Sequence, residues 1–157
     1  MAKTDPAPEF KPVRIAVLTI SDTRGTDDDR SGDTLVERLK ADGHQLADRS
    51  IVKDDSDFIE SRLRDWIDNP DVDVVIATGG TGVTGRDVTP EAFKRVCEKD
   101  IPGFGELFRW ISYRKIATST IQSRATAGVA GGTYLFSLPG SPGACKDAWD
   151  EILLHQL

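Results

Sequence analysis

The sequence predicts a three-layer α/β/α domain built on a mostly parallel β-sheet with one antiparallel edge hairpin. Short apolar, β-branched segments alternate with amphipathic helical segments along most of the 157 residues. The connections between them are short, which places helices on both faces of a parallel sheet. Near the C-terminus, Gly131-Gly132 separates two strand-like segments, as in a tight hairpin turn. That hairpin supplies the antiparallel pair.

The first strand and helix are predicted from residues 14–43. Residues 14–20 (RIAVLTI) form a continuous apolar run, typical of a strand covered on both faces. The acidic stretch 27–29 is expected to be exposed. A helix with an apolar stripe follows, with Ser31 or Asp33 as its cap and Gly43 as its C-terminal stop.

The next two strands differ in character. Residues 45–53 are less apolar, which favours a strand near an edge, whereas residues 72–77 (VDVVIA) predict a central one. The helix between them ends at Asn69-Pro70. Its candidate N-terminal caps are Asp55, Ser56 and Asp57.

The remaining elements follow the same alternation. Thr89 is the expected cap of a helix with Pro90 in its first turn. Residues 104–115 predict a further helix, and 133–138 predict the second strand of the hairpin. A last helix carrying Ala148, Trp149, Ile152 and Leu153 completes the domain.

Composition limits the partners and the compartment. The chain has 26 acidic and 20 basic residues, and this excess of negative charge disfavours binding to nucleic acid and to anionic membranes. No apolar run is long enough for a membrane span. Cys97 and Cys145 have no closely spaced partner, which suits a reducing cytoplasm. Residues 1–12 are expected to form a flexible tail and residues 13–157 a single domain.

Three polar segments follow predicted strands and are expected to meet at one edge of the sheet, where ligands of such folds bind. The central segment, 78–82 (TGGTG), can direct several backbone N–H groups at an anion such as phosphate. The threonines add hydroxyl donors. The expected binding residues are Ser21, Asp22, Thr78, Gly79, Gly80, Thr81, Gly82, Pro139, Gly140 and Ser141.

Two better-known phosphate motifs do not fit this glycine run. Residues 80–85 match G-x-G-x-x-G, but the next helix is predicted to begin only at Thr89-Pro90, too late for a dinucleotide fingerprint. No Gly-Lys-Ser/Thr closes the loop as in a P-loop. The segment therefore predicts an anion cradle of another kind.

Carboxylates beside that cradle predict a magnesium site. Asp87 lies on the same loop and Asp54 follows the second strand. Mg²⁺ is commonly held by one or two carboxylates together with phosphate oxygens. Helix capping is the competing role for Asp54, Asp55 and Asp57. Because His44 and His155 lack ligand-spaced partners, a zinc site is not expected, and the residue set favours phosphoryl or nucleotidyl transfer.

Six motifs in a fixed order resemble the MoaB/MogA family of molybdenum cofactor biosynthesis proteins. Their combination covers nearly the whole chain beyond the tail, and residues 117–125 and 144–157 are most similar to the MoaB branch. The motifs are 19–22 (TISD), 78–82 (TGGTG), 86–92 (RDVTPEA), 102–106 (PGFGE), 123–124 (SR) and 138–142 (LPGSP).

The resemblance implies a molybdopterin-binding fold and a homo-oligomer, trimeric or hexameric. It further implies an adenylyltransferase that uses ATP and Mg²⁺ to adenylylate the terminal phosphate of molybdopterin. By motif position, Asp54 and Asp87 match the family's catalytic, metal-binding carboxylates, with Asp55 as a one-residue alternative to Asp54. A protein that binds molybdopterin without adenylylating it is the alternative function.

Overall fold

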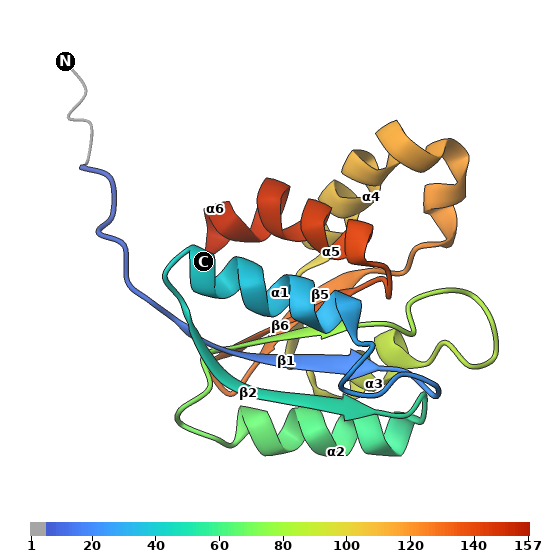
Figure 1. The fold of residues 1–157 in the computed structure, drawn as a ribbon, viewed down its shortest axis with the longest axis horizontal. Helices are drawn as coiled ribbons and strands as arrows, with labels where there is room; N and C mark the ends of the chain where they lie inside the picture. Colours follow the sequence, from blue (N-terminus) through green and yellow to red (C-terminus); the bar gives the residue numbers. More distant parts are fainter. Residues whose placement is uncertain (1–5) are drawn as a thin grey trace.

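The computed structural model describes residues 6–157, so residues 1–5 of the predicted tail lie outside the described part. Residues 6–13 contain no helix or strand, although the Phe10 ring packs 5.2 Å from that of His44. The described chain forms one six-stranded sheet between two helical layers (Figure 1). The predicted α/β fold with a mostly parallel sheet is confirmed.

The sheet has the order β2-β1-β3-β6-β5-β4. The first four strands in this order run parallel, and the antiparallel pairs β6–β5 and β5–β4 form one side of the sheet. The strands are β1 (Arg14–Ile20), β2 (Gln45–Val52), β3 (Val74–Thr78), β4 (Lys99–Asp100), β5 (Thr126–Ala130) and β6 (Thr133–Leu138). The two-residue β4 was not predicted, because so short a segment shows no periodicity.

Helices cover both faces of the sheet, as predicted. One layer contains α1, α4 and α5, and the other contains α2 and α3 (Figure 1). The helices are α1 (Arg30–Ala41), α2 (Ser56–Ile67), α3 (Thr89–Val96), α4 (Pro102–Ile116), η1 (Ala117–Gln122), α5 (Pro142–Ala148), the π-helical η2 (Trp149–Leu153) and α6 (Leu154–Gln156). None of them is long and apolar enough to cross a membrane.

Alternate residues of β1 face opposite sides of the sheet, which explains why two hydrophobic cores form. Ile15 and Val17 face the α1 layer, whereas Ala16, Leu18 and Ile20 face the α2 layer. All five are nearly inaccessible to solvent, so β1 is covered on both faces as its apolar run predicts. The hairpin is confirmed too: Gly131 and Gly132 have φ values of 56° and 82°, which glycine adopts readily.

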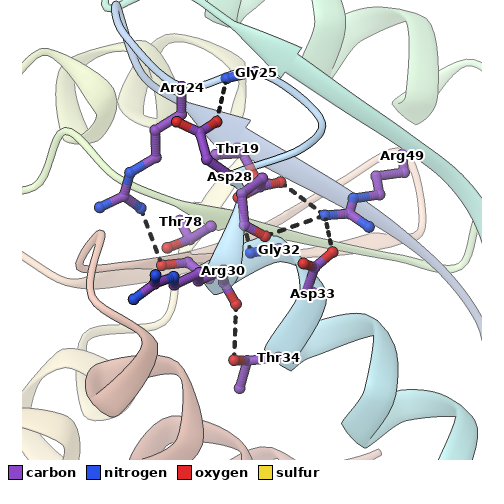
Figure 2. Close-up of polar contacts among 12 residues, drawn as sticks. Thr19, Arg24, Gly25, Asp28, Arg30, Gly32, Asp33, Thr34, Arg49 and Thr78 are labelled. Carbon is purple, nitrogen blue, oxygen red and sulfur yellow. Dashed lines mark hydrogen bonds and ion pairs between the residues drawn. The ribbon is translucent and has the colours of Figure 1, made fainter.

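The start of α1 differs from the prediction. Its N-cap is Asp29, whose carboxylate accepts a hydrogen bond from the Gly32 N–H. Asp29 is fully buried rather than exposed, because Thr19 of β1 and Arg49 of β2 both donate to it. Figure 2 shows Arg49 reaching this first turn beside Gly32 and Asp33. The local sequence around Asp29 cannot show that its partners lie on two strands.

Candidate functional site

The polar segments at the carboxyl ends of β1, β2, β3 and β6 come together at one edge of the sheet. The N–H of Gly79 donates to Leu138 O (2.9 Å), and the N–H of Asp54 donates to the Asp22 carboxylate (3.0 Å). The N–H of Ser21 donates to Val52 O (2.9 Å). These bonds join the segments in two pairs, and the pairing of Thr19 with Thr78 between β1 and β3 places the two pairs side by side at the edge predicted to bind ligand.

The glycine loop after β3 uses backbone conformations that favour glycine. Gly79 and Gly80 have φ values of 111° and 68°. A Cβ on Gly79 would lie 2.3 Å from Ile20 O, and one on Gly80 would lie 2.3 Å from the Thr89 hydroxyl. Neither the Gly80 nor the Thr81 N–H donates to a backbone carbonyl within residues 6–157. These two donors are therefore available to an anion, as predicted for a cradle.

Thr89 fastens this loop instead of capping α3. Its buried hydroxyl donates to Gly79 O (2.9 Å), and its N–H donates to Gly80 O (3.1 Å). Val88 occupies the N-cap position and makes no side-chain cap bond. The predicted cap at Thr89 is therefore wrong, because a tertiary hydrogen bond to the loop takes the hydroxyl.

Other predicted hydroxyl donors also belong to the framework of the site. The Thr78 hydroxyl is buried and donates to Pro139 O (2.8 Å), which joins the glycine loop to the 139–141 turn. Ser21 Oγ accepts from the N–H of Arg24 (3.1 Å), and Ser141 Oγ caps α5 by accepting from the Ala144 N–H (3.1 Å). The structure thus places these residues at the site but directs the Thr78 hydroxyl at protein rather than ligand.

Asp54 is the carboxylate that faces the glycine loop. Its Oδ1 lies 3.3 Å from the position that a Cβ of Gly80 would take. Asp55 instead caps α2, accepting from the N–H groups of Asp57 and Phe58. Burial raises the pKa of Asp54, and the negative charges of Asp22 and then Asp87 raise it further. Three carboxylates therefore share this edge, an arrangement that a cation would stabilise.

Asp87 faces the same edge but is held in its ionised form. Burial alone would raise the pKa of Asp87, but hydrogen bonds from Thr84 and Gly82 and the charge of Arg124 outweigh burial and lower it. Its Oδ2 accepts from the Thr84 N–H (2.9 Å) and hydroxyl (2.8 Å). The two predicted carboxylates thus have pKa values shifted in opposite directions.

Two cavities flank the glycine loop and share Gly80, Asp87 and Gly140 in their walls. The smaller, of about 280 Å³, is bordered by Ser21, Arg24 and Asp54. The larger, of about 640 Å³, extends over α4 and η1 to Lys115. Its size suits a small organic ligand. A molecule in one cavity can therefore meet a molecule in the other at Gly80.

Arg124 holds the loop that carries Asp87 and was noted in the sequence only as part of a motif. Its guanidinium donates to Gly82 O and to Asp87 O, both at 2.7 Å, and pairs with Glu91 of α3. Its N–H also donates to Thr81 O (2.9 Å). No local signal predicts this role, because its partners lie 33 to 43 residues away.

The residues present fit a metal held jointly with substrate. Within residues 6–157 no group of three or more His, Cys, Asp or Glu side chains is arranged to hold a metal ion. Asp54 and Asp87 instead offer carboxylate oxygens beside an anion cradle, and burial, followed by the negative charges of Asp22 and Asp87, raises the pKa of Asp54. Mg²⁺ suits such a site, because it commonly combines one or two carboxylates with phosphate oxygens.

Known proteins match this sequence along nearly the whole chain. The family model described as "Probable molybdopterin binding domain" matches residues 16–157. Molybdenum cofactor biosynthesis protein B of Escherichia coli K12 is 47% identical over 149 residues, spanning 95% of this chain and 88% of that protein. The corresponding Bacillus cereus protein is 47% identical over 148 residues, spanning 94% of this chain and 88% of that one.

Solved structures share the fold. A crystal structure of molybdenum cofactor biosynthesis protein B superimposes with a TM-score of 0.90 at 46% identity, covering 93% of this chain and 91% of that one. The tungsten cofactor synthesizing protein MoaB from Pyrococcus furiosus gives a TM-score of 0.83 at 36% identity, covering 92% of each chain.

Proposed function

This chain belongs to the MoaB/MogA family of molybdenum cofactor biosynthesis proteins, and from that premise we propose that it adenylylates the terminal phosphate of molybdopterin with Mg-ATP. The family establishes molybdenum cofactor biosynthesis and a molybdopterin-binding domain. The nucleotidyl transfer itself is our proposal. We further propose that it takes place in the cytoplasm, where the two free cysteines would stay reduced.

The observation that supports transfer is the meeting of two cavities at one anion cradle. In our proposal molybdopterin occupies the larger cavity and ATP the smaller, with Gly80 between them. An oxygen of the pterin phosphate attacks the α-phosphorus of ATP, and a new P–O bond forms as the bond to the β-phosphate breaks. Pyrophosphate leaves with that electron pair. No protein nucleophile is needed.

The residues at the cradle supply positioning and electrostatic stabilisation. The free N–H groups of Gly80 and Thr81 would bind a phosphate oxygen where the two anions meet. Asp54 and Asp87 would hold Mg²⁺, which reduces the repulsion between the two phosphate groups. Arg124 keeps Asp87 in place by binding the backbone on either side of the loop. Hydrogen bonds from Thr89 and Arg124 hold the loop within the protein itself, and such positioning favours catalysis.

One observation favours the alternative of a molybdopterin-binding protein without transferase activity. The Asp87 Oδ2 already accepts two hydrogen bonds from Thr84, so it has less capacity to bind a metal. In that case the larger cavity would hold molybdopterin and Asp87 would order the loop. The glycine cradle serves either function, which makes turnover the deciding measurement.

Pyrophosphate release decides between the two functions. Purified protein is incubated with molybdopterin and Mg-ATP, and pyrophosphate is quantified alongside adenylylated molybdopterin. Parallel reactions lacking molybdopterin or containing a chelator correct for ATP hydrolysis and metal-free turnover. Transfer that requires both molybdopterin and Mg²⁺ supports the proposal. Binding of molybdopterin without any pyrophosphate release would establish the non-catalytic alternative.

We also propose a homo-oligomer, a trimer or hexamer, formed through the outer face of α4. Phe104, Phe108 and Ile111 fill the core, but Leu107, Trp110 and Tyr113 are 41%, 69% and 56% exposed. An isolated subunit rarely leaves so many large apolar side chains in water. Light scattering should give an oligomeric mass at micromolar concentration, and Trp110→Glu should lower it. A stable wild-type monomer would contradict this interface.

A further inference from the structure

Arg24 lies in the wall of the smaller cavity, on the loop between β1 and α1. Its side chain is half-buried. One guanidinium nitrogen donates to Gly140 O (3.1 Å) and to the Ser31 hydroxyl (3.4 Å). Figure 2 shows the guanidinium directed at the first turn of α1. Both contacts are with neutral oxygen atoms, and the bond to Gly140 O is the shorter one.

The charge of Arg24 has no counterpart within the described protein. It forms no ion pair with a carboxylate of residues 6–157, whereas Arg49 pairs with Asp29 and Arg86 pairs with Asp22. The buried Asp29 precedes the same helix that Arg24 approaches, yet its partner is Arg49. A half-buried guanidinium held only by neutral groups gains strongly from an anion, because it loses hydration without receiving a negative charge in return.

The other charged residues in the wall of this cavity indicate which kind of anion would fit. Asp54 and Asp87 border the same cavity and favour a cation, while Arg24 and the glycine loop favour an anion. A phosphate group that carries a divalent cation matches both kinds of residue at once. A simple carboxylate ligand would match Arg24 but leave the two aspartates uncompensated.

We propose that Arg24 binds a phosphate oxygen of the substrate in the smaller cavity and thereby selects phosphorylated ligands. The identity of that substrate as ATP rests on the proposed function. The phosphate chemistry could also be that of molybdopterin, so the two ligands form separate arms of the test. In either arm Arg24 acts directly on the ligand, with the Gly140 carbonyl holding its guanidinium in place.

The test compares four substitutions, Arg24→Gln, Arg24→Lys, Arg30→Gln and Ser31→Ala, by calorimetric titration with AMP, ADP and ATP in the presence of Mg²⁺, and with molybdopterin under anaerobic conditions. Arg24→Gln removes the charge. Arg30→Gln removes the same charge from an exposed position of α1 outside both cavities. Ser31→Ala removes the hydroxyl donor to Gly140 O (2.8 Å) but leaves Arg24 charged. Circular dichroism checks the fold of each variant.

Arg24→Gln should weaken ATP binding about 10- to 100-fold, the usual effect of losing a hydrogen bond to a charged group. Arg24→Lys should lose less, since it keeps the charge without the planar fork. Arg30→Gln and Ser31→Ala should change the affinity less than about threefold. A loss confined to molybdopterin would assign Arg24 to the pterin phosphate and support the same chemistry.

Two results would overturn the proposal. The first is unchanged binding of every ligand by Arg24→Gln. The second is an equal loss in Ser31→Ala, which would show that Arg24 only supports the turn at Gly140. The proposed function fails separately: wild type that binds ATP but never releases pyrophosphate leaves the Arg24 assignment intact. Wild type that binds none of these phosphate ligands would refute both.

Discussion

Asp73 and Asp54 lie at opposite ends of the same sheet and have pKa values shifted in opposite directions. Asp73 precedes β3 at the amino edge, where the Arg14 guanidinium and N–H donate to it and lower its pKa. Asp54 follows β2 at the carboxyl edge, where burial and the charge of Asp22 raise its pKa. Both are aspartates beside a strand end, so the opposite directions of their pKa shifts come from their surroundings.

The comparison separates the part of the molecule that maintains the fold from the part arranged for a ligand. At the amino edge the negative charges of Asp71 and Asp73 are matched by Arg14. At the carboxyl edge carboxylates gather around Asp54, and Arg24 lacks an ionic partner within the described residues. Charges left unmatched inside a cavity reduce stability, and their presence at one edge is typical of a functional site.

The largest expected effect concerns the carboxyl edge. Asp54→Asn and Asp87→Asn should each slow adenylyl transfer at least about 100-fold, because metal positioning contributes several kcal/mol to such reactions. Molybdopterin affinity should stay the same or rise slightly, since a repulsive charge is removed. Single-turnover transfer and equilibrium binding are measured on the same proteins, with Asp73→Asn as the matched control. Normal transfer by both variants would refute the assignment of these carboxylates.

Asp54→Asn should also alter stability in a defined direction. Because the folded pKa of Asp54 is raised, ionisation destabilises the native state as the pH rises through that value. At neutral pH the substitution should therefore leave the unfolding temperature unchanged or slightly higher. If the unfolding temperature of the variant is clearly lower than that of wild type in the same buffer, Asp54 supports the fold, as Asp73 does.

The second effect compares two glycines with similar backbone conformations. Gly80 at the carboxyl edge has φ 68°, and Gly132 in the hairpin at the amino edge has φ 82°. Alanine costs about 1 kcal/mol at either φ. Only at Gly80 would the new methyl group meet the Thr89 hydroxyl at 2.3 Å, whereas Gly132 opens onto free space.

Ligand binding should therefore distinguish the two variants. We expect Gly80→Ala to weaken molybdopterin and ATP binding more than about tenfold, because displacing the loop misaligns the free N–H donors. Gly132→Ala should bind both normally. Calorimetric titration and thermal unfolding measure the two properties. If Gly80→Ala binds as tightly as wild type, the loop does not hold the ligand.

A smaller effect is expected from Arg124, which positions the loop without facing the ligand. Arg124→Gln removes the bonds to Gly82 O and Asp87 O and should slow transfer about tenfold, the equivalent of about 1.4 kcal/mol. The loss should appear mainly in kcat, with little change in KM. Arg95→Gln, which breaks an exposed ion pair with Glu60, is the control. Equal rates in both variants would show that Arg124 is dispensable.

The smallest functional effect is expected at the amino edge. Asp73→Asn should transfer adenylyl groups at the wild-type rate but unfold more readily. Since the folded pKa of Asp73 is lowered, its contribution to stability is full above the unfolded value of about 3.9 and disappears as the pH falls through the folded value. Urea unfolding from pH 7 to pH 2 should show wild type losing more stability than the variant. Parallel pH profiles would refute the Arg14–Asp73 pairing.

Local patterns in the sequence predicted most of the architecture. Continuous apolar runs and helical stripes located β1, β3 and the main helices, because burial on both faces or on one stripe leaves a repeating signature. Gly131-Gly132 predicted the hairpin turn, and Pro90 the first turn of α3. The positions of Asp54 and Asp87 after predicted strands placed both at the carboxyl edge, and the structure has both beside the glycine loop.

The sequence alone determined the order of the main helices and strands, the glycine loop and the family. Only the tertiary structure decided which polar groups serve the framework and which remain for a ligand. Thr89 binds Gly79 O instead of capping its helix, and Asp29 is buried between two strands. Asp55 caps α2 and leaves Asp54 at the loop. A hydroxyl or carboxylate can form hydrogen bonds with several local or distant groups. Folding decides which of these bonds forms, because it brings distant residues together.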